Sequence, residues 1–294
     1  MPKIKKTIAE CVAMHRAINE LQPKSQSIIN SDYDMGLKAA YSFNRTADYL
    51  ETPLKPLQKL EEEFSKKIQE LNQSVKDSTK EEREEAQKQL DELQEKFSSD
   101  RNEILAIEEE VDVHAIDLAD ISDKTRTPAY WILDAIRDCF TNKVTSTEVV
   151  KMTIKDALEV RKAVQLYLAA PTPWDIENAK SQNPKLDIPA DAKYPNDCGW
   201  PLASKLFWNS EIIRKSLSEF MDEYDNKIDA IRSTEDKSEG KKKAEEFDLW
   251  VSEKLEELVS FEGITTIGIN DFPDDLATPS GAVIGGLMPI LQED

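Results

Sequence analysis

Two stretches of this sequence repeat one spacing of apolar residues, and this spacing favours long amphipathic helices over other structures. The first stretch has apolar residues at Leu57, Leu60, Phe64, Ile68 and Leu71. The second has the same intervals of three, four, four and three residues, at Leu217, Phe220, Tyr224, Ile228 and Ile231. Residues three and four apart share one face of a helix, so each stretch is predicted to carry a seam that packs against another helix.

A polar break and a second amphipathic segment follow each stretch, as in a helical hairpin. The breaks at 72–80 and 233–241 are poor in apolar residues and are predicted to be loops. The second segments are predicted to be helices over 81–107 and 244–261. A helix of about 30 residues is roughly 45 Å long, so each hairpin is expected to stand out as an arm.

Shorter elements around the hairpins recur in the same order. Helical patterns over 8–21 and 154–168 come first, and alternating apolar residues after the hairpins predict half-buried strands over 111–115 and 265–269. A Thr-Pro pair, typical of a helix start, then precedes a short apolar helix in each half, at Thr127-Pro128 and Thr278-Pro279. An aromatic–asparagine pair also precedes each seam, at Phe43-Asn44 and Trp208-Asn209.

The common order of helix, helix, polar tip, helix, strand and short helix predicts a tandem duplication in a mainly α (α+β) fold. The first unit is predicted to cover 1–145 and the second 146–294, with an irregular Pro-rich insertion at 169–201. Two unrelated helical domains that share only ordinary hairpin patterning are the alternative. Two short strands are marginal alone, so they are expected to pair between the units or with a partner chain.

Two prolines, Pro53 and Pro56, fall within the first long helical stretch. Proline lacks the backbone hydrogen-bond donor and clashes with the preceding turn, so a kink or break is expected near Thr52. The second half has no proline at the matching place, and an uninterrupted helix is expected there.

The charge and cysteine content exclude several classes of protein. The chain has 58 acidic and 38 basic residues, a formal charge of −20, which argues against binding to a nucleic-acid backbone or an anionic membrane. No stretch of 18 apolar residues occurs, so no membrane span is expected. Three widely separated cysteines, Cys11, Cys139 and Cys198, form no disulfide framework and favour a reducing compartment.

The sequence contains no motif of a catalytic, cofactor or metal site. His15 and His114 are far apart and no Cys-x-x-Cys accompanies them, so a zinc site is not expected. Asp117 and Asp271 follow the two predicted strands at matching places, and this repetition favours a turn-forming role. A cryptic enzyme that uses one of these two aspartates is the least favoured hypothesis.

Each half resembles a small bacteriophage protein family of uncharacterised function. The likeness rests on a short amphipathic helix (8–21), a charged helical hairpin (57–107), and a Val-x-Val strand with a short helix (111–140). The Pro-rich insertion departs from this pattern. The resemblance implies a phage origin, with a location in the reducing cytoplasm of a host cell or in a virion, and brings no catalytic residues.

These features lead to a hypothesis of a non-enzymatic, phage-encoded protein that binds a protein partner through its arms. It would inhibit or adapt a host protein, or assemble with phage proteins or with itself. A virion structural protein is one alternative. An acidic nucleic-acid mimic that blocks a DNA-handling host enzyme is another, because 244–294 holds 12 acidic residues and one lysine. The candidate contact residues are Trp174, Tyr194, Trp200, Lys241, Lys242 and Lys243.

Overall fold

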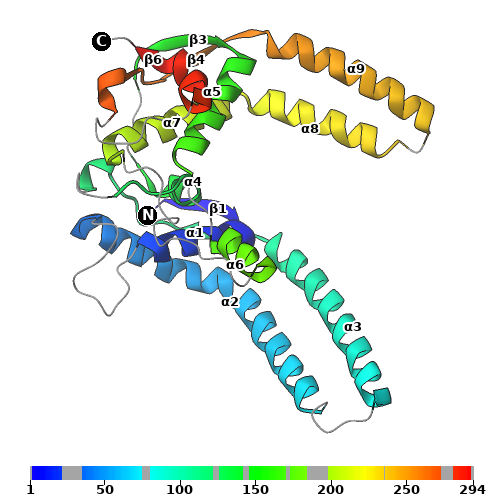
Figure 1. Cartoon of the computed structure of the whole chain (residues 1–294). Helices are drawn as coiled ribbons and strands as arrows, with labels where there is room; N and C mark the ends of the chain where they lie inside the picture. Colours follow the sequence, from blue (N-terminus) through cyan, green and yellow to red (C-terminus); the bar gives the residue numbers. More distant parts are fainter. Residues whose placement is uncertain are drawn as a thin grey trace. The chain divides into compact units, whose positions relative to one another are not determined.

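The chain folds into two compact units that are each mainly helical (Figure 1). Unit 1 comprises Met1–Ser31, Met35–Ile121 and Asp134–Thr141, and unit 2 comprises Asp32–Asp34, Ser122–Leu133 and Asn142–Asp294. The structure is a computed structural model that describes residues 2–21, 35–74, 80–121, 126–141, 146–169, 173–183, 198–234, 236–272 and 281–292. The predicted mainly α (α+β) class is confirmed.

Unit 1 consists of a small base and a long helical hairpin. Its elements are β1 (Lys3–Thr7), α1 (Ile8–Leu21), α2 (Leu37–Ser74), α3 (Lys80–Leu105), β2 (Glu108–Asp112), η1 (Leu118–Asp120), the end of α4 (Tyr130–Ile136) and η2 (Arg137–Cys139). Strands β1 and β2 pair antiparallel, with Lys3 opposite Asp112. One face of α1 is buried in the base, through Ile8, Cys11, Met14, Ala17, Ile18 and Leu21.

Unit 2 has a base and a hairpin of the same kind. Its elements are the start of α4, β3 (Val149–Thr153), α5 (Ile154–Tyr167), α6 (Pro173–Gln182), α7 (Trp200–Ser216), α8 (Ser218–Arg232), α9 (Lys237–Leu255), β4 (Leu258–Glu262), β5 (Ile267–Gly268), η4 (Ile269–Asp271), α10 (Gly281–Leu287), η5 (Met288–Ile290) and β6 (Leu291–Gln292). Strands β3 and β4 pair antiparallel, and β5 pairs parallel with β6. Helix α5 buries the same six positions as α1, namely Ile154, Ala157, Val160, Ala163, Val164 and Tyr167.

Both units turn from the first strand into the first helix in the same way. In unit 1 the Thr7 hydroxyl accepts the amide of Glu10 at 3.2 Å, and the Glu10 carboxylate accepts the amide of Thr7 at 2.9 Å. In unit 2 the Thr153 hydroxyl accepts the amide of Asp156 at 3.1 Å. A threonine followed three residues later by an acidic residue satisfies free amides of the first turn, so the helix starts there.

An ion pair at the base marks equivalent positions in the two units. Lys38 contacts Asp120 at 2.7 Å in unit 1, and Lys205 contacts Asp271 at 2.9 Å in unit 2. Phe64 lies 26 residues after Lys38, whereas its counterpart Tyr224 lies 19 residues after Lys205. Each of these two aromatic residues contacts a ring on the other helix of its hairpin, as described below. The outward helical segment is therefore seven residues longer in unit 1. Descent from a duplicated ancestor stays a prediction.

The expected pairing of strands between units or with a partner chain is wrong for the described strands. Strand β2 pairs with β1 and β4 pairs with β3, inside each unit. The first strand of each pair was not predicted, because the sequences Lys-Ile-Lys-Lys-Thr and Val-Val-Lys-Met-Thr are short and do not alternate cleanly. The strand predicted over 111–115 occurs as Glu108–Asp112, and that over 265–269 is reduced to Ile267–Gly268.

The expected break near Thr52 is wrong, because α2 continues through Pro53 and Pro56. Leu50, Leu54 and Leu57 are buried on either side of the prolines. Burial of such side chains is worth about 1.5–3 kcal/mol each, which offsets the cost of about 3 kcal/mol for an internal proline. The interruption occurs instead in unit 2, at Leu217 between α7 and α8, where no proline is present.

Several predicted boundaries also move. The loop predicted over 233–241 is shorter, since α9 begins at Lys237 with the Asp236 side chain accepting the amides of Ser238 and Glu239. Helix α9 ends at Leu255, so the segment up to Phe261 that was expected to be helical contains β4. The insertion predicted to be irregular contains α6, and the break at 75–79 lies outside the described residues.

Candidate functional site in the helical arms

Each unit projects a two-helix arm whose seam is only half covered. The first arm is α3 with the part of α2 beyond Leu57, and the second arm is α8 with α9. No residue of α8 or α9 is buried, and none of the described side chains in the first arm is buried. Two helices cover each other on one side only, so the seam keeps an open side in each arm.

Aromatic side chains hold the two helices of each arm together. Phe64 and Phe97 stack with ring centroids 4.0 Å apart in the first arm. In the second arm Phe220 stacks on Trp250 at 5.6 Å, and Tyr224 meets Phe247 at 5.1 Å. Aromatic pairs of this kind add about 0.5–1.5 kcal/mol each beyond the area they bury, which stabilises the packing of the two helices.

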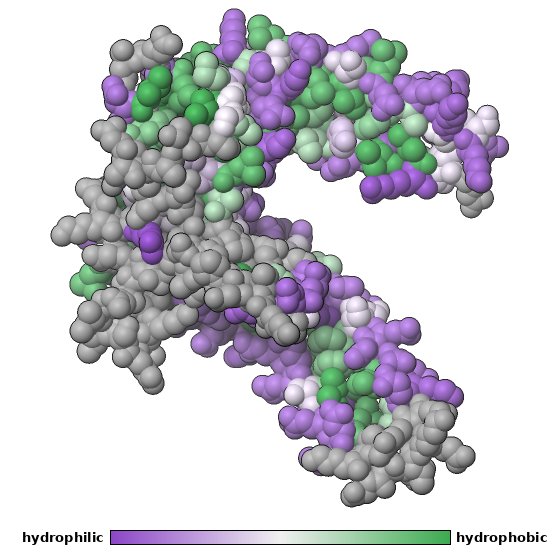
Figure 2. All heavy atoms as spheres, viewed as in Figure 1, coloured by the Kyte–Doolittle hydropathy of each residue, from purple (hydrophilic) through white to green (hydrophobic). Residues whose placement is uncertain are grey.

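A hollow opens beside the seam of each arm at equivalent positions. The first hollow is about 370 Å³ and is lined by Lys67, Glu70, Leu71, Gln89 and Leu93. The second is about 220 Å³ and is lined by Lys227, Ala230, Ile231, Lys243, Glu246 and Phe247. Lys227, Ala230 and Ile231 each follow their counterparts Lys67, Glu70 and Leu71 by 160 positions. Figure 2 shows apolar surface between hydrophilic side chains on both arms.

The three lysines predicted as contact residues lie on α9 and form ion pairs within the helix. Lys241 reaches Glu245 at 3.8 Å, Lys242 reaches Glu246 at 3.6 Å, and Lys243 reaches Glu239 at 2.8 Å. Helix α9 therefore carries five basic and five acidic residues. The count of acidic residues over 244–294 left out four of the five lysines of α9, because they precede residue 244. The balanced charge of α9 argues against its acting as a nucleic-acid mimic.

The structure describes the side chain of one of the three aromatic candidates, and that residue differs from the expectation. Trp200 was expected to be an exposed contact residue, but it is 5% exposed because it begins α7 and packs into the base of unit 2. Trp174 lies in α6, and its side chain is outside the described part of the structure. Tyr194 also lies outside the described residues. The seam aromatics of the arms, which the heptad spacing did reveal, were not proposed as contacts.

The repeated aspartate of the bases is Asp120 with Asp271, and Asp117 was the wrong counterpart. Asp271 accepts the amide of Gly268 at 3.2 Å and pairs with Lys205, and Asp120 pairs with Lys38. These contacts give both carboxylates a structural role at the start of the long helix. The two residues of the pair are 82 positions apart in unit 1 and 66 in unit 2, so no single spacing in the sequence would have identified them.

A polar clamp joins the long helix to the chain after the second strand. In unit 2 Asn209 is buried and binds the backbone of Thr265, donating to its carbonyl at 2.7 Å and accepting its amide at 2.8 Å. In unit 1 Thr46 accepts the amide of His114 at 3.0 Å, and the Ser42 hydroxyl lies 3.0 Å from His114 Nδ1. Because Ser42 stands at the position of Asn209, the Ser–His contact occupies the place of the Asn209 clamp.

The predicted match of Phe43-Asn44 with Trp208-Asn209 is therefore wrong by two residues. Asn44 is exposed and its side chain donates to the Ala40 carbonyl in its own helix. His15 likewise forms a hydrogen bond within its own helix, from its Nδ1 to the Asn19 side chain one turn away at 3.3 Å. The asparagines share a residue type and differ in burial, which sequence spacing alone does not show.

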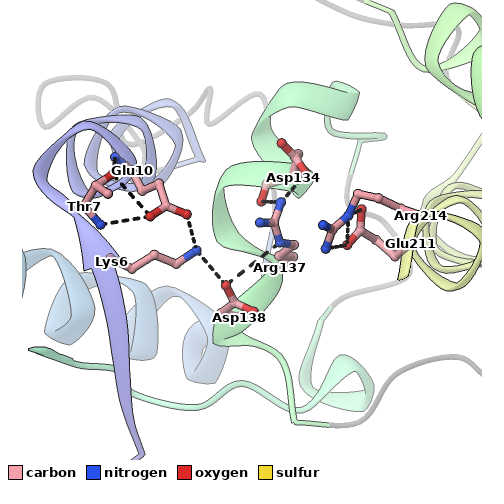
Figure 3. Close-up of polar contacts among 8 residues, drawn as sticks. All are labelled: Lys6, Thr7, Glu10, Asp134, Arg137, Asp138, Glu211 and Arg214. Atoms are coloured by element: carbon pink, nitrogen blue, oxygen red, sulfur yellow. Dashed lines mark hydrogen bonds and ion pairs between the residues drawn. The ribbon is translucent and has the colours of Figure 1, made fainter. Parts of the chain in front are cut away.

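A buried lysine forms the most connected polar cluster of unit 1. Figure 3 shows Lys6 of β1 between Glu10 and Asp138, each at 2.9 Å. Burial lowers the pKa of Lys6, but the hydrogen bonds it donates to Asp138 and Glu10 outweigh burial and raise the pKa above its usual value. Burial raises the pKa of Glu10, but the Thr7 amide and Lys6 outweigh it and lower the pKa. Each charge of Lys6, Glu10 and Asp138 thus has an opposite charge within the cluster.

Reactive or metal-binding groups are not gathered in the described part of the chain. Cys11, Cys139 and Cys198 are buried and form no disulfide with one another, and burial raises the pKa of Cys11 to about 11 and of Cys139 to about 12. Among the described residues, no three side chains of the kinds that bind metals come together. No helix in the described ranges has the length and apolarity needed to cross a membrane.

The arms are thus the part of each unit whose apolar side chains are least buried by the unit itself. No protein-family model, curated protein or solved structure matches the chain.

Proposed function

We propose that this protein is a non-enzymatic binding protein whose two arms each hold a helix of a protein partner. The supporting observation is the repeated hollow beside a half-exposed seam, in two arms that share little sequence. A third helix laid along such a seam would complete its packing, as in a helical bundle. A phage origin, and action on a host protein or within an assembly, are part of this proposal.

The two hollows suggest what the partner helix must present. Each hollow combines an aliphatic floor, Leu71 or Ile231, with a lysine on the outward helix, Lys67 or Lys227. An apolar side chain would fill the floor, and burying it would contribute roughly 25 cal/mol per Å². A carboxylate one turn away on the partner helix could reach the lysine.

The experiment compares capture of proteins from host lysate by the wild-type chain and by charge-reversed variants. The test variant combines Lys67→Glu with Lys227→Glu, in the two hollows. The matched control combines Lys66→Glu with Lys237→Glu, which changes net charge equally at exposed positions outside the lining residues. Circular dichroism checks that both variants fold.

A partner that the control variant retains and the hollow variant loses supports the proposal. A partner retained equally by both variants overturns the role of the hollows. Repeating the capture at high salt and after nuclease treatment separates the alternatives, because a DNA-handling enzyme lost at high salt would indicate the acidic mimic. Recovery of the chain alone in a larger assembly would indicate a virion or assembly role.

A further inference from the structure

One face of the long helix is covered in unit 2 and bare in unit 1. On α7 the positions 204, 207, 208 and 211 form a single stripe, and all four residues are buried: Ser204, Phe207, Trp208 and Glu211. The equivalent positions of α2, 167 residues earlier, are occupied by Leu37, Ala40, Tyr41 and Asn44. Leu37 is 88% exposed and Tyr41 is 57% exposed.

Phe207 of this stripe contacts Tyr130, which belongs to a segment of unit 2 that precedes the rest of the unit in the sequence. Tyr130 lies against Phe207 with ring centroids 5.5 Å apart, and its hydroxyl is 3.2 Å from that of Ser210. The Tyr130 amide also donates to the Leu168 carbonyl at 2.9 Å. At the end of this segment Leu133 is 1% exposed.

The counterpart of this segment is the C-terminal helix α10. A parallel β-pairing follows the short helix in both units. Ile116 pairs with Phe140 in unit 1, and Ile267 pairs with Leu291 in unit 2. Both pairs are 151 positions apart, so Ile284 corresponds to Leu133.

Helix α10 leaves an apolar outer face bare. Ile284 is 38% exposed and Met288, which follows α10, is 62% exposed. The opposite face is packed on α5, where a Cβ added to Gly286 would come within 2.7 Å of the Ala163 Cβ. The ten residues 281–290 contain no charge, in a chain that is 33% charged.

We propose that copies of this chain join head to tail, with the outer face of α10 covering the Leu37–Tyr41 face of α2 in the next copy. Both surfaces are apolar, and a methionine beside an aromatic ring is a favourable contact. The contact would repeat between chains the contact that Tyr130 makes with α7 inside unit 2. Because the two faces differ, the association has no twofold symmetry and generates rings or filaments.

The test measures the mass of the full chain by analytical ultracentrifugation over a range of concentration. The variants are Leu37→Glu on α2 and Met288→Glu beside α10, both at exposed positions, and Leu249→Glu is the matched control because Leu249 is also 62% exposed. The wild type and the control are expected to form species whose masses are multiples of the monomer mass. The buffer contains salt, because screening the charge of −20 favours assembly. Each test variant alone is expected to be monomeric.

Mixing the two test variants gives the decisive result. Each retains one intact face, so an equimolar mixture is expected to form a dimer and nothing larger. A wild type that stays monomeric at every concentration, or a mixture that stays monomeric, would overturn the proposal. Assembly lost in Leu249→Glu but kept in both test variants would place self-association on the arm instead. Tyr41→Glu provides a second α2 variant, and circular dichroism confirms folding.

Discussion

The fourth residue of the first strand differs in chemistry between the two units while its place in the fold is the same. Lys6 in unit 1 and Met152 in unit 2 are both buried, at 8% and 4% exposure. Lys6 is held by two carboxylates, whereas Met152 carries no charge. The comparison teaches that a long side chain at this position packs into the base of the unit. A charged side chain is tolerated there only when opposite charges pair with it.

The largest effect is expected where the polar clamps differ. Asn209→Ala would leave the amide and the carbonyl of Thr265 without their partner, at a cost of about 3 kcal/mol in the free energy of unfolding. Thr46→Ala removes only the acceptor of the His114 amide and is expected to cost about 1.5 kcal/mol. Urea denaturation monitored by tryptophan fluorescence and circular dichroism measures both. Asn44→Ala is the control and should change stability by less than about 0.5 kcal/mol.

The next effect concerns the buried lysine. Asp138→Ala leaves Lys6 with one partner and is expected to cost about 2 kcal/mol, below the usual value for a fully buried pair because Asp138 is 34% exposed. Lys6→Met reproduces unit 2 and is expected to be close to neutral. A double variant that carries both changes should be no less stable than Asp138→Ala alone. A strongly destabilised Lys6→Met would contradict the comparison.

A smaller effect is expected at the short helices. Gly286→Ala places a Cβ 2.8 Å from the Glu159 carbonyl oxygen and is expected to cost about 1 kcal/mol, after the gain in helix propensity. The equivalent residue of α4 is already an alanine, Ala135, and Ala135→Gly is expected to lose about 1 kcal/mol through propensity. For units of this size either loss lowers Tm by roughly 2–4 °C, which calorimetry resolves. A higher Tm for Gly286→Ala would show that α10 does not pack closely on α5.

The smallest effect is the pH dependence of unit 1. The lowered pKa of Glu10 gives stability that is present above the usual value of 4.5 and is lost as pH falls through the lowered value. The raised pKa of Lys6 gives stability that is present below 10.5 and is lost as pH rises through the raised value. Lys6→Met should therefore remove the alkaline limb of a plot of urea midpoint against pH and reduce the acid limb, where the Thr7 amide still lowers the pKa of Glu10. Lys3→Met, at an exposed strand position, should leave both limbs unchanged.

The sequence predicted the hairpins because their seams are set by local spacing. Intervals of three and four residues identify a helix face without knowledge of the partner. The strands β1 and β3 were missed because each is five residues long and pairs with a strand about a hundred residues away. The burial of Trp200 and the role of Asp120 likewise depend on tertiary contacts that local spacing does not show. The covered and bare faces of α7 and α2 are visible only once the two units are compared position by position.

The seven additional residues between Lys38 and Phe64 have a consequence for how such an arm can vary. Seven residues add about 10 Å of helix and turn it through nearly two full turns, within about 20° of its starting direction. The seam therefore points the same way before and after the addition. Reach and orientation are thereby uncoupled: an arm of this design can lengthen in steps of seven residues while its seam keeps its direction.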